Sequence, residues 1–246
     1  MGVASALLTR GAKVILTSTR QAKLDDKISQ LRSIYKELDP SHVTGYTLDL
    51  GSQTVEDNIR SLVSQLQKDG INKIEHLVYL AGDPLPLFKL EDIEIDSWMK
   101  ASQIRTISFV LCIKHFLPLI KAAGPASADY SASITLTGAL VADKPLKGGW
   151  TLLAMVAAAV NGAARQLALD LKPIRVNTVA PGVVDTELWA HMSDEERKGF
   201  YEEVEKNMPM GRVGDVRDVA EAYAYAMSDG NLTGEVLRTN SGGLLV

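Results

Sequence analysis

A short polar segment, TSTR at residues 17–20, directly follows an apolar run and carries groups that could bind a phosphate. Ser18 and Thr19 supply hydroxyls, Arg20 supplies a guanidinium, and Lys23 follows one turn later. In nucleotide-binding α/β folds, an acid at such a strand end binds the 2′-hydroxyl of NAD, whereas basic and hydroxyl residues accept the 2′-phosphate of NADP. No acid precedes Asp25. If a dinucleotide binds, the segment favours NADP(H).

The elements that would position these groups are predicted strands and helices, which alternate along the chain as they do around a parallel sheet. Several strands are apolar throughout, which is typical of strands covered by helices on both faces. The predicted fold class is α/β, a doubly wound parallel sheet (Rossmann-like), in one domain over residues 1–246. The predicted strands are 13–18, 43–48, 74–80, 133–137, 175–179 and 235–239, and the predicted helices are 21–37, 54–68, 96–122, 151–171 and 216–228.

One long irregular connection, residues 183–213, follows the strand predicted at 175–179. Long excursions at this end of a sheet are usually lids or substrate walls. We therefore predict a lid segment that contains short helices.

Composition argues against several classes of protein. A net charge of −4, with 46% hydrophobic and 23% charged residues, is ordinary for a soluble domain and argues against a nucleic-acid partner. The single cysteine, Cys112, excludes an internal disulfide and favours a reducing compartment, so the cytoplasm is expected. No apolar run reaches the roughly 20 residues of a membrane span, so no membrane partner is expected. The histidines show no metal-like spacing, and no metal site is predicted.

Three blocks, LVYLAGD, LALDLKPIRVNTVAPGVVDTEL and GRVGDVRDVAEAYAYAMSDGNLTGEVLRTNSGG, occur in this order along the chain. They resemble the short-chain dehydrogenase/reductase (SDR) superfamily over nearly the whole chain. The segments GWTLLA and DLKPIRVN are similar to SDR-like proteins of fungal secondary metabolism. The resemblance implies a small-molecule substrate and a homodimer or homotetramer, and it constrains the fold more than the reaction.

The resemblance also implies a cofactor site. In relatives, an acid after the third strand bonds the adenine amino group, a small turn admits the adenine ribose, and a PGxxxT segment holds the nicotinamide carboxamide. The matching residues are Asp49, Ala81, Gly82, Pro181, Gly182 and Thr186.

The family's glycine-rich fingerprint and its first strand are absent from this sequence. In relatives, that turn delivers the pyrophosphate to a helix N-terminus. Here Met1 and Gly2 fall just past it, inside the first helix. Two explanations stay open: Met1 is an internal methionine of a longer native chain, or the chain is truncated and binds poorly. In both cases we expect a sheet without its first strand.

The family's proton relay is also lost. Ordinary members use a Tyr-x-x-x-Lys pair, a serine and an asparagine. Alignment on VNGAARQLALDL places Leu153 at the tyrosine position and Ala157 at the lysine position. The serine falls at Thr137 or Gly138, and the asparagine falls at Arg105.

Three residues are candidates to replace that relay. Arg105 could polarise a carbonyl, and Thr137 could keep a hydroxyl in the site. Asp143 could act as an acid or base if desolvation raised its pKa.

Three functions fit these patterns. The favoured one is an atypical NADP(H)-dependent oxidoreductase acting on a bulky apolar metabolite in secondary-metabolite biosynthesis, because the later cofactor blocks remain. The second is a non-redox cyclase or isomerase on the same scaffold. The third is an inactive relative that serves as a binding or assembly partner.

Overall fold

The computed structural model describes residues 1–124 and 132–246, in which helices and strands alternate. Every predicted strand is present, with ends that differ from the prediction by at most two residues. The strands are β1 (Val14–Ser18), β2 (Val43–Thr47), β3 (His76–Tyr79), β4 (Ser133–Thr137), β5 (Arg175–Pro181) and β6 (Val236–Thr239). The α-helices are α1 (Gly2–Leu8), α2 (Gln21–Ile34), α3 (Val55–Lys68), α4 (Ile95–Ser102), α5 (Ser108–Ala123), α6 (Thr151–Asp170), α7 (Asp194–Asn207) and α8 (Val216–Ser228).

All neighbouring strands run parallel. Strands β1 and β2 form one sheet, and a second sheet has the order β3-β4-β5-β6. In β4 and β5, Ile134 stands opposite Val176, and both side chains are fully buried. Helices lie on both faces, as expected from strands that are apolar throughout. The predicted α/β doubly wound, Rossmann-like fold is confirmed.

Strands β1 and β3 do not pair with each other, so the strands form two separate sheets. Within residues 1–124 and 132–246, each of these strands pairs with one neighbour only. Side chains of β1 and β3 are mostly half-buried, whereas those of β4 and β5 are mostly buried. Helix α1 leads into β1, and no strand precedes it among the described residues, as predicted.

Backbone amides of β1 and β3 are expected to exchange hydrogen faster than those of β4. Strand β4 has a partner on each side, whereas β1 and β3 leave one edge of N–H and C=O groups without a strand partner. Exchange measured by mass spectrometry on peptides covering residues 14–18, 76–79 and 133–137 tests this. A peptide covering β5 is the control, because β5 also has two neighbours. Equal protection of β1 and β4 would contradict the divided sheet.

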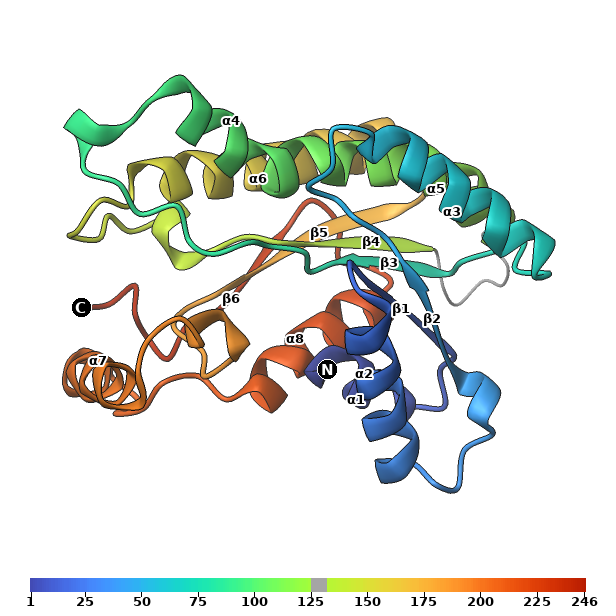
Figure 1. The fold of residues 1–246 in the computed structure, drawn as a ribbon, viewed down its shortest axis with the longest axis horizontal. Coiled ribbons are helices and arrows are strands. Elements are labelled where there is room, and N and C mark those ends of the chain that lie inside the picture. Colours follow the sequence, from blue (N-terminus) through green and yellow to red (C-terminus); the bar gives the residue numbers. More distant parts are fainter. Residues whose placement is uncertain (125–131) are drawn as a thin grey trace.

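The helices form two layers around the strands. Helices α3 to α6 cover one face, and α1, α2 and α8 lie on the other (Figure 1). The main core lies under the first layer and includes Ile59, Phe116 and Ile120. On the other face, Val179 of β5 packs with Tyr223 of α8.

The helix predicted over 96–122 is interrupted. A π-helix, Gln103–Ile107, separates α4 from α5 and carries Arg105. Single π-turns inside α-helices occur frequently at functional sites, because they change the direction in which side chains project. The lid segment, residues 183–213, contains the short helix η5 (Glu187–Trp189) and α7.

Two helical stretches, Ile95–Ala123 and Thr151–Asp170, are long and apolar enough to cross a membrane by length and composition alone. The sequence expectation that no segment reaches this length is therefore wrong. In this structure both stretches belong to the helix layer on the sheet, and Phe116 and Ala164 are part of the main core. Burial between sheet and helices accounts for their apolar composition.

Candidate active site

A cavity of about 620 Å³ opens at the carboxyl ends of β3, β4 and β5. Its lining includes residues 80–83 after β3, 137–141 at the end of β4 and 181–184 at the end of β5. Parts of α6, α8 and the lid segment complete the wall. Parallel α/β sheets bind their ligands at this edge, so the cavity is the candidate site.

Most of the wall is apolar. Leu153 and Ala157, which occupy the family's tyrosine and lysine positions, line the cavity and are buried. Further apolar lining residues are Leu85, Phe109, Leu136, Val156, Val160 and Trp189. A wall of this kind suits an apolar ligand that is oriented by a few polar groups.

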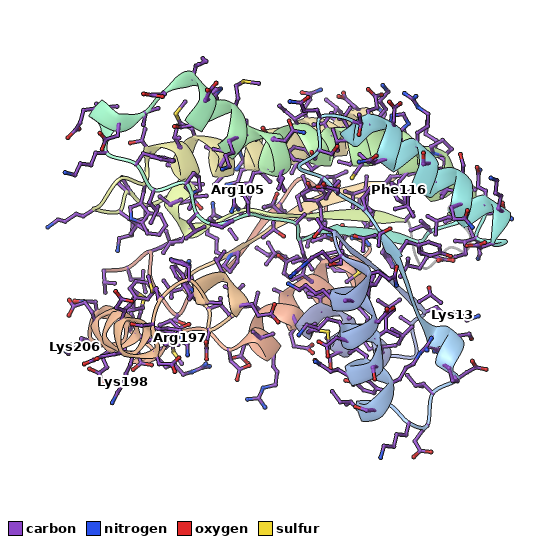
Figure 2. All side chains as sticks on the ribbon, viewed as in Figure 1. Lys13, Arg105, Phe116, Arg197, Lys198 and Lys206 are labelled. Atoms are coloured by element: carbon purple, nitrogen blue, oxygen red, sulfur yellow. The ribbon has the colours of Figure 1, made fainter. Side chains whose placement is uncertain are left out.

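Arg105 provides such a polar group and is paired with Asp83. Its Nε lies 3.1 Å from Asp83 Oδ1, and its Nη2 donates a hydrogen bond to the Asp83 backbone oxygen. The two side chains are 17% and 21% exposed, and both line the cavity. Burial lowers the pKa of Arg105 and the Asp83 carboxylate raises it, so the guanidinium stays charged. Figure 2 shows Arg105 between the upper helix layer and the strands.

The hydroxyl of Thr137 is held by two partners. It donates to the backbone oxygen of Tyr79 at 2.7 Å, and its Oγ1 lies 2.7 Å from the Tyr223 hydroxyl. Because the single hydroxyl hydrogen of Thr137 points to Tyr79, Tyr223 is the donor in the second bond. Burial raises the pKa of Tyr223, which keeps the phenol protonated. Thr137 lines the cavity, but in this arrangement its hydroxyl joins α8 to the sheet.

Gly138, the other position that could match the family serine, has no room for a side chain. A Cβ there would lie 2.9 Å from Thr178 Cγ2 and 3.0 Å from Asn161 Oδ1. A serine could therefore enter only if the side chains of Thr178 and Asn161 shifted.

Asp143 is not among the described residues that line the cavity. Its carboxylate forms a two-point ion pair with Arg238, with Nε–Oδ2 at 2.8 Å and Nη2–Oδ1 at 3.2 Å. This ion pair links the loop that follows β4 to strand β6. An acid–base role for Asp143 stays a prediction, and it would require this ion pair to open.

The residues matched to the nicotinamide and ribose lie together at the cavity. They are Ala81, Gly82, Pro181, Gly182 and Thr186. Thr186 also caps η5, since its Oγ1 accepts a hydrogen bond from the Leu188 amide at 3.3 Å. The end of β5 therefore fits the nicotinamide of a dinucleotide, and the turn after β3 fits its adenine ribose.

The other residues matched to the adenosine half and its 2′-phosphate lie beyond the cavity lining, at the end of β1 and after β2. They are Ser18, Thr19, Arg20 and Asp49. Asp49 accepts a hydrogen bond from the Gly51 amide at 2.9 Å. The cavity reaches α2 at Lys23, whose Nζ lies 3.2 Å from a Glu187 carboxylate oxygen.

Sequence reasoning missed Asp83, Tyr223 and Glu187 as cavity residues. Asp83 directly follows Ala81 and Gly82, so its place after a strand could have marked it. Tyr223 and Glu187 come from distant segments, and only tertiary packing brings them to the cavity.

Comparison with known proteins assigns the family. A family model described as an SDR-like Rossmann domain matches residues 1–246. The chain belongs to the SDR family. Its relatives include the short-chain dehydrogenase/reductase ucsE of Acremonium sp, 33% identical over 244 residues that span 99% of this chain and 90% of ucsE. Another is fsr5 of Gibberella fujikuroi, 32% identical over 251 residues that span 99% of this SDR and 89% of fsr5. The predicted resemblance to fungal secondary-metabolism SDRs is confirmed.

Solved structures agree with this assignment. The MalC reductase/Diels-Alderase of Malbranchea aurantiaca superposes with a TM-score of 0.87 at 29% identity, covering 100% of this SDR and 92% of MalC. A small-chain dehydrogenase in complex with NADPH superposes with a TM-score of 0.73 at 28% identity, covering 87% and 92% of the two chains.

Proposed function

We propose that this SDR is an NADP(H)-dependent oxidoreductase that acts in the cytoplasm on a bulky apolar metabolite of secondary metabolism. One observation carries the proposal: one apolar cavity joins the Pro181–Gly182 turn to the half-buried Arg105–Asp83 pair. The NADPH in the related dehydrogenase structure supports a nicotinamide cofactor.

Each part of the cofactor has candidate residues. Those that would hold the nicotinamide are Pro181, Gly182 and Thr186. Those that would contact the adenosine are Asp49, Ala81 and Gly82. Those that would hold the 2′-phosphate are Ser18, Thr19 and Arg20. NADP(H) bound there supplies or accepts a hydride.

Arg105 supplies the electrostatic part of the proposed chemistry. Its Nη1 makes no hydrogen bond to another described residue and would donate to a substrate carbonyl oxygen, stabilising negative charge on that oxygen. The apolar wall lowers the local polarity and strengthens this interaction. Leu153 and Ala157 have no acidic hydrogen to transfer, so solvent or the substrate itself would provide the proton.

NADPH is expected to bind saturably at submillimolar concentration and more tightly than NADH. Trp150 and Trp189 line the cavity, so their fluorescence reports binding. Arg20→Ala is expected to weaken NADPH binding about tenfold, with little change for NADH, because only NADPH carries a 2′-phosphate. The control is Arg60→Ala, an exposed arginine on α3. Absence of a saturable response at millimolar NADPH would remove the proposal.

A non-redox cyclase or isomerase is the second candidate. Two observations favour it: apolar side chains fill the tyrosine and lysine positions, and the related MalC is named a reductase/Diels-Alderase. Such a reaction could proceed through orientation in the cavity alone. Product that forms at the same rate when NADPH is omitted would favour this candidate over the first.

Assembly into a homodimer or homotetramer is part of the proposal. Val110 on α5 and Met155 on α6 are each 48% exposed, and small residues on α6 would let a second helix approach closely. Light scattering on the purified chain measures the oligomer size.

A further inference from the structure

The charged side chains on the cavity wall occur in pairs. Among the described lining residues, the charged side chains are Lys23, Asp83, Arg105 and Glu187. Lys23 pairs with Glu187, where the cavity reaches α2, and Arg105 pairs with Asp83. The cavity therefore presents hydrogen-bond donors without a net side-chain charge.

Asp83 restrains Arg105 through two atoms. The Nε and Oδ1 atoms of the ion pair are both shielded from solvent. The backbone oxygen of Asp83 accepts a hydrogen bond from Nη2. The other terminal nitrogen, Nη1, makes no hydrogen bond to another described residue. The π-helix brings Arg105 to this position, and the hydroxyl of Tyr79 donates to its Ile104 carbonyl at 2.6 Å.

Gly82 lets the guanidinium pack closely against the backbone after β3. A Cβ at this position would lie 3.1 Å from Nη1 and 3.3 Å from Nη2, which is closer than an ordinary van der Waals contact. A side chain there would push Arg105 away, so the glycine keeps the guanidinium in its place beside Asp83.

We propose that Arg105 and Asp83 form a binding site for a neutral carbonyl oxygen of an apolar ligand, and that Asp83 determines this preference. Asp83 already compensates the guanidinium charge. A carboxylate ligand would bring a second negative charge next to the Asp83 carboxylate in a poorly solvated wall, and that charge would remain uncompensated. A ketone or amide oxygen accepts the Nη1 hydrogen without this cost. Asp83 is thus a positioning residue that also selects against anions.

A matched pair of ligands tests this proposal: 2-acetylnaphthalene, a neutral ketone, and 2-naphthoate, a carboxylate of similar shape. Binding is measured by quenching of tryptophan fluorescence. The unmodified chain is expected to bind the ketone about tenfold more tightly than the carboxylate. Asp83→Asn leaves the guanidinium charge uncompensated and is expected to reverse the preference. Asp83→Glu keeps the charge and should keep the preference.

The ratio of the two affinities is the readout, because a general loss of packing weakens both ligands alike. Arg105→Gln is expected to abolish the preference and weaken ketone binding. A carboxylate preference in the unmodified chain, failure of both ligands to bind, or an unchanged ratio in Asp83→Asn would overturn the proposal. The inference rests on the proposed use of the cavity as a substrate site but not on hydride transfer. If NADPH fails to bind while the ketone preference and its reversal persist, only the oxidoreductase proposal falls.

Discussion

Replacing Arg105 with alanine is expected to lower kcat/KM for an apolar carbonyl substrate by about 10²–10³-fold, the usual cost of removing one preorganised donor from a reacting oxygen. The effect should fall on turnover more than on cofactor affinity, because Arg105 lies on the π-helix, whereas the residues matched to the nicotinamide lie at the end of β5 and just after it. Steady-state kinetics with NADPH, combined with the fluorescence titration, measures both quantities.

The matched control for this experiment is Arg60→Ala, which removes an exposed arginine from α3. It should leave kcat/KM unchanged. Thermal unfolding of both variants separates a catalytic loss from a folding defect. If Arg105→Ala stays folded and keeps full turnover, Arg105 has no role in the chemistry.

Replacing Arg175 with alanine is expected to lower the free energy of unfolding by about 3–5 kcal/mol. Arg175 begins β5 and is only 4% exposed. Its Nη1 and Nη2 donate to the Ala226 and Met227 carbonyls at 2.7 Å each, and Nη1 also reaches the Leu232 carbonyl at 3.2 Å. Ala226 and Met227 are in the last turn of α8, where carbonyls lack helical partners. Alanine would leave them buried without these donors.

Urea unfolding monitored by circular dichroism provides the measurement for Arg175→Ala. Arg165→Ala is the control, because Arg165 is exposed on α6, and it should change the free energy by less than about 0.5 kcal/mol. Arg175→Lys keeps one donor group and should lie between the two. Equal stability of the Arg175 and Arg165 variants would show that the buried guanidinium does not support the end of α8.

The regular part of the fold could be predicted from the sequence because its causes are local. Continuous apolar runs such as 14–16 and 77–80 mark strands covered on both faces, and all six predicted strands are present. The π-helix at Gln103–Ile107 could not be predicted, because the apolar periodicity continues through it into α5. The expectation that no stretch reaches the length and apolarity of a membrane span was wrong, because two core helices reach both.

The site was predictable only in part. Motif residues that follow strands, such as Gly82, Pro181 and Thr186, line the cavity because the carboxyl ends of parallel strands converge. The partners of the candidate catalytic residues were not predictable. Asp143 pairs with Arg238 across 95 positions, and Thr137 meets Tyr223 across 86. Such contacts depend on how α8 and β6 pack against the rest of the chain, and no local pattern encodes them.

The fate of the C4 hydrogen of the cofactor is the decisive measurement. The purified chain would be incubated with its carbonyl substrate and NADPH deuterated at C4, in parallel reactions for the two faces of the ring, and the product analysed by mass spectrometry. A cavity that orients the carbonyl toward the nicotinamide predicts one deuterium in the product from one of the two labelled cofactors. Product that contains no deuterium in either reaction would contradict hydride transfer.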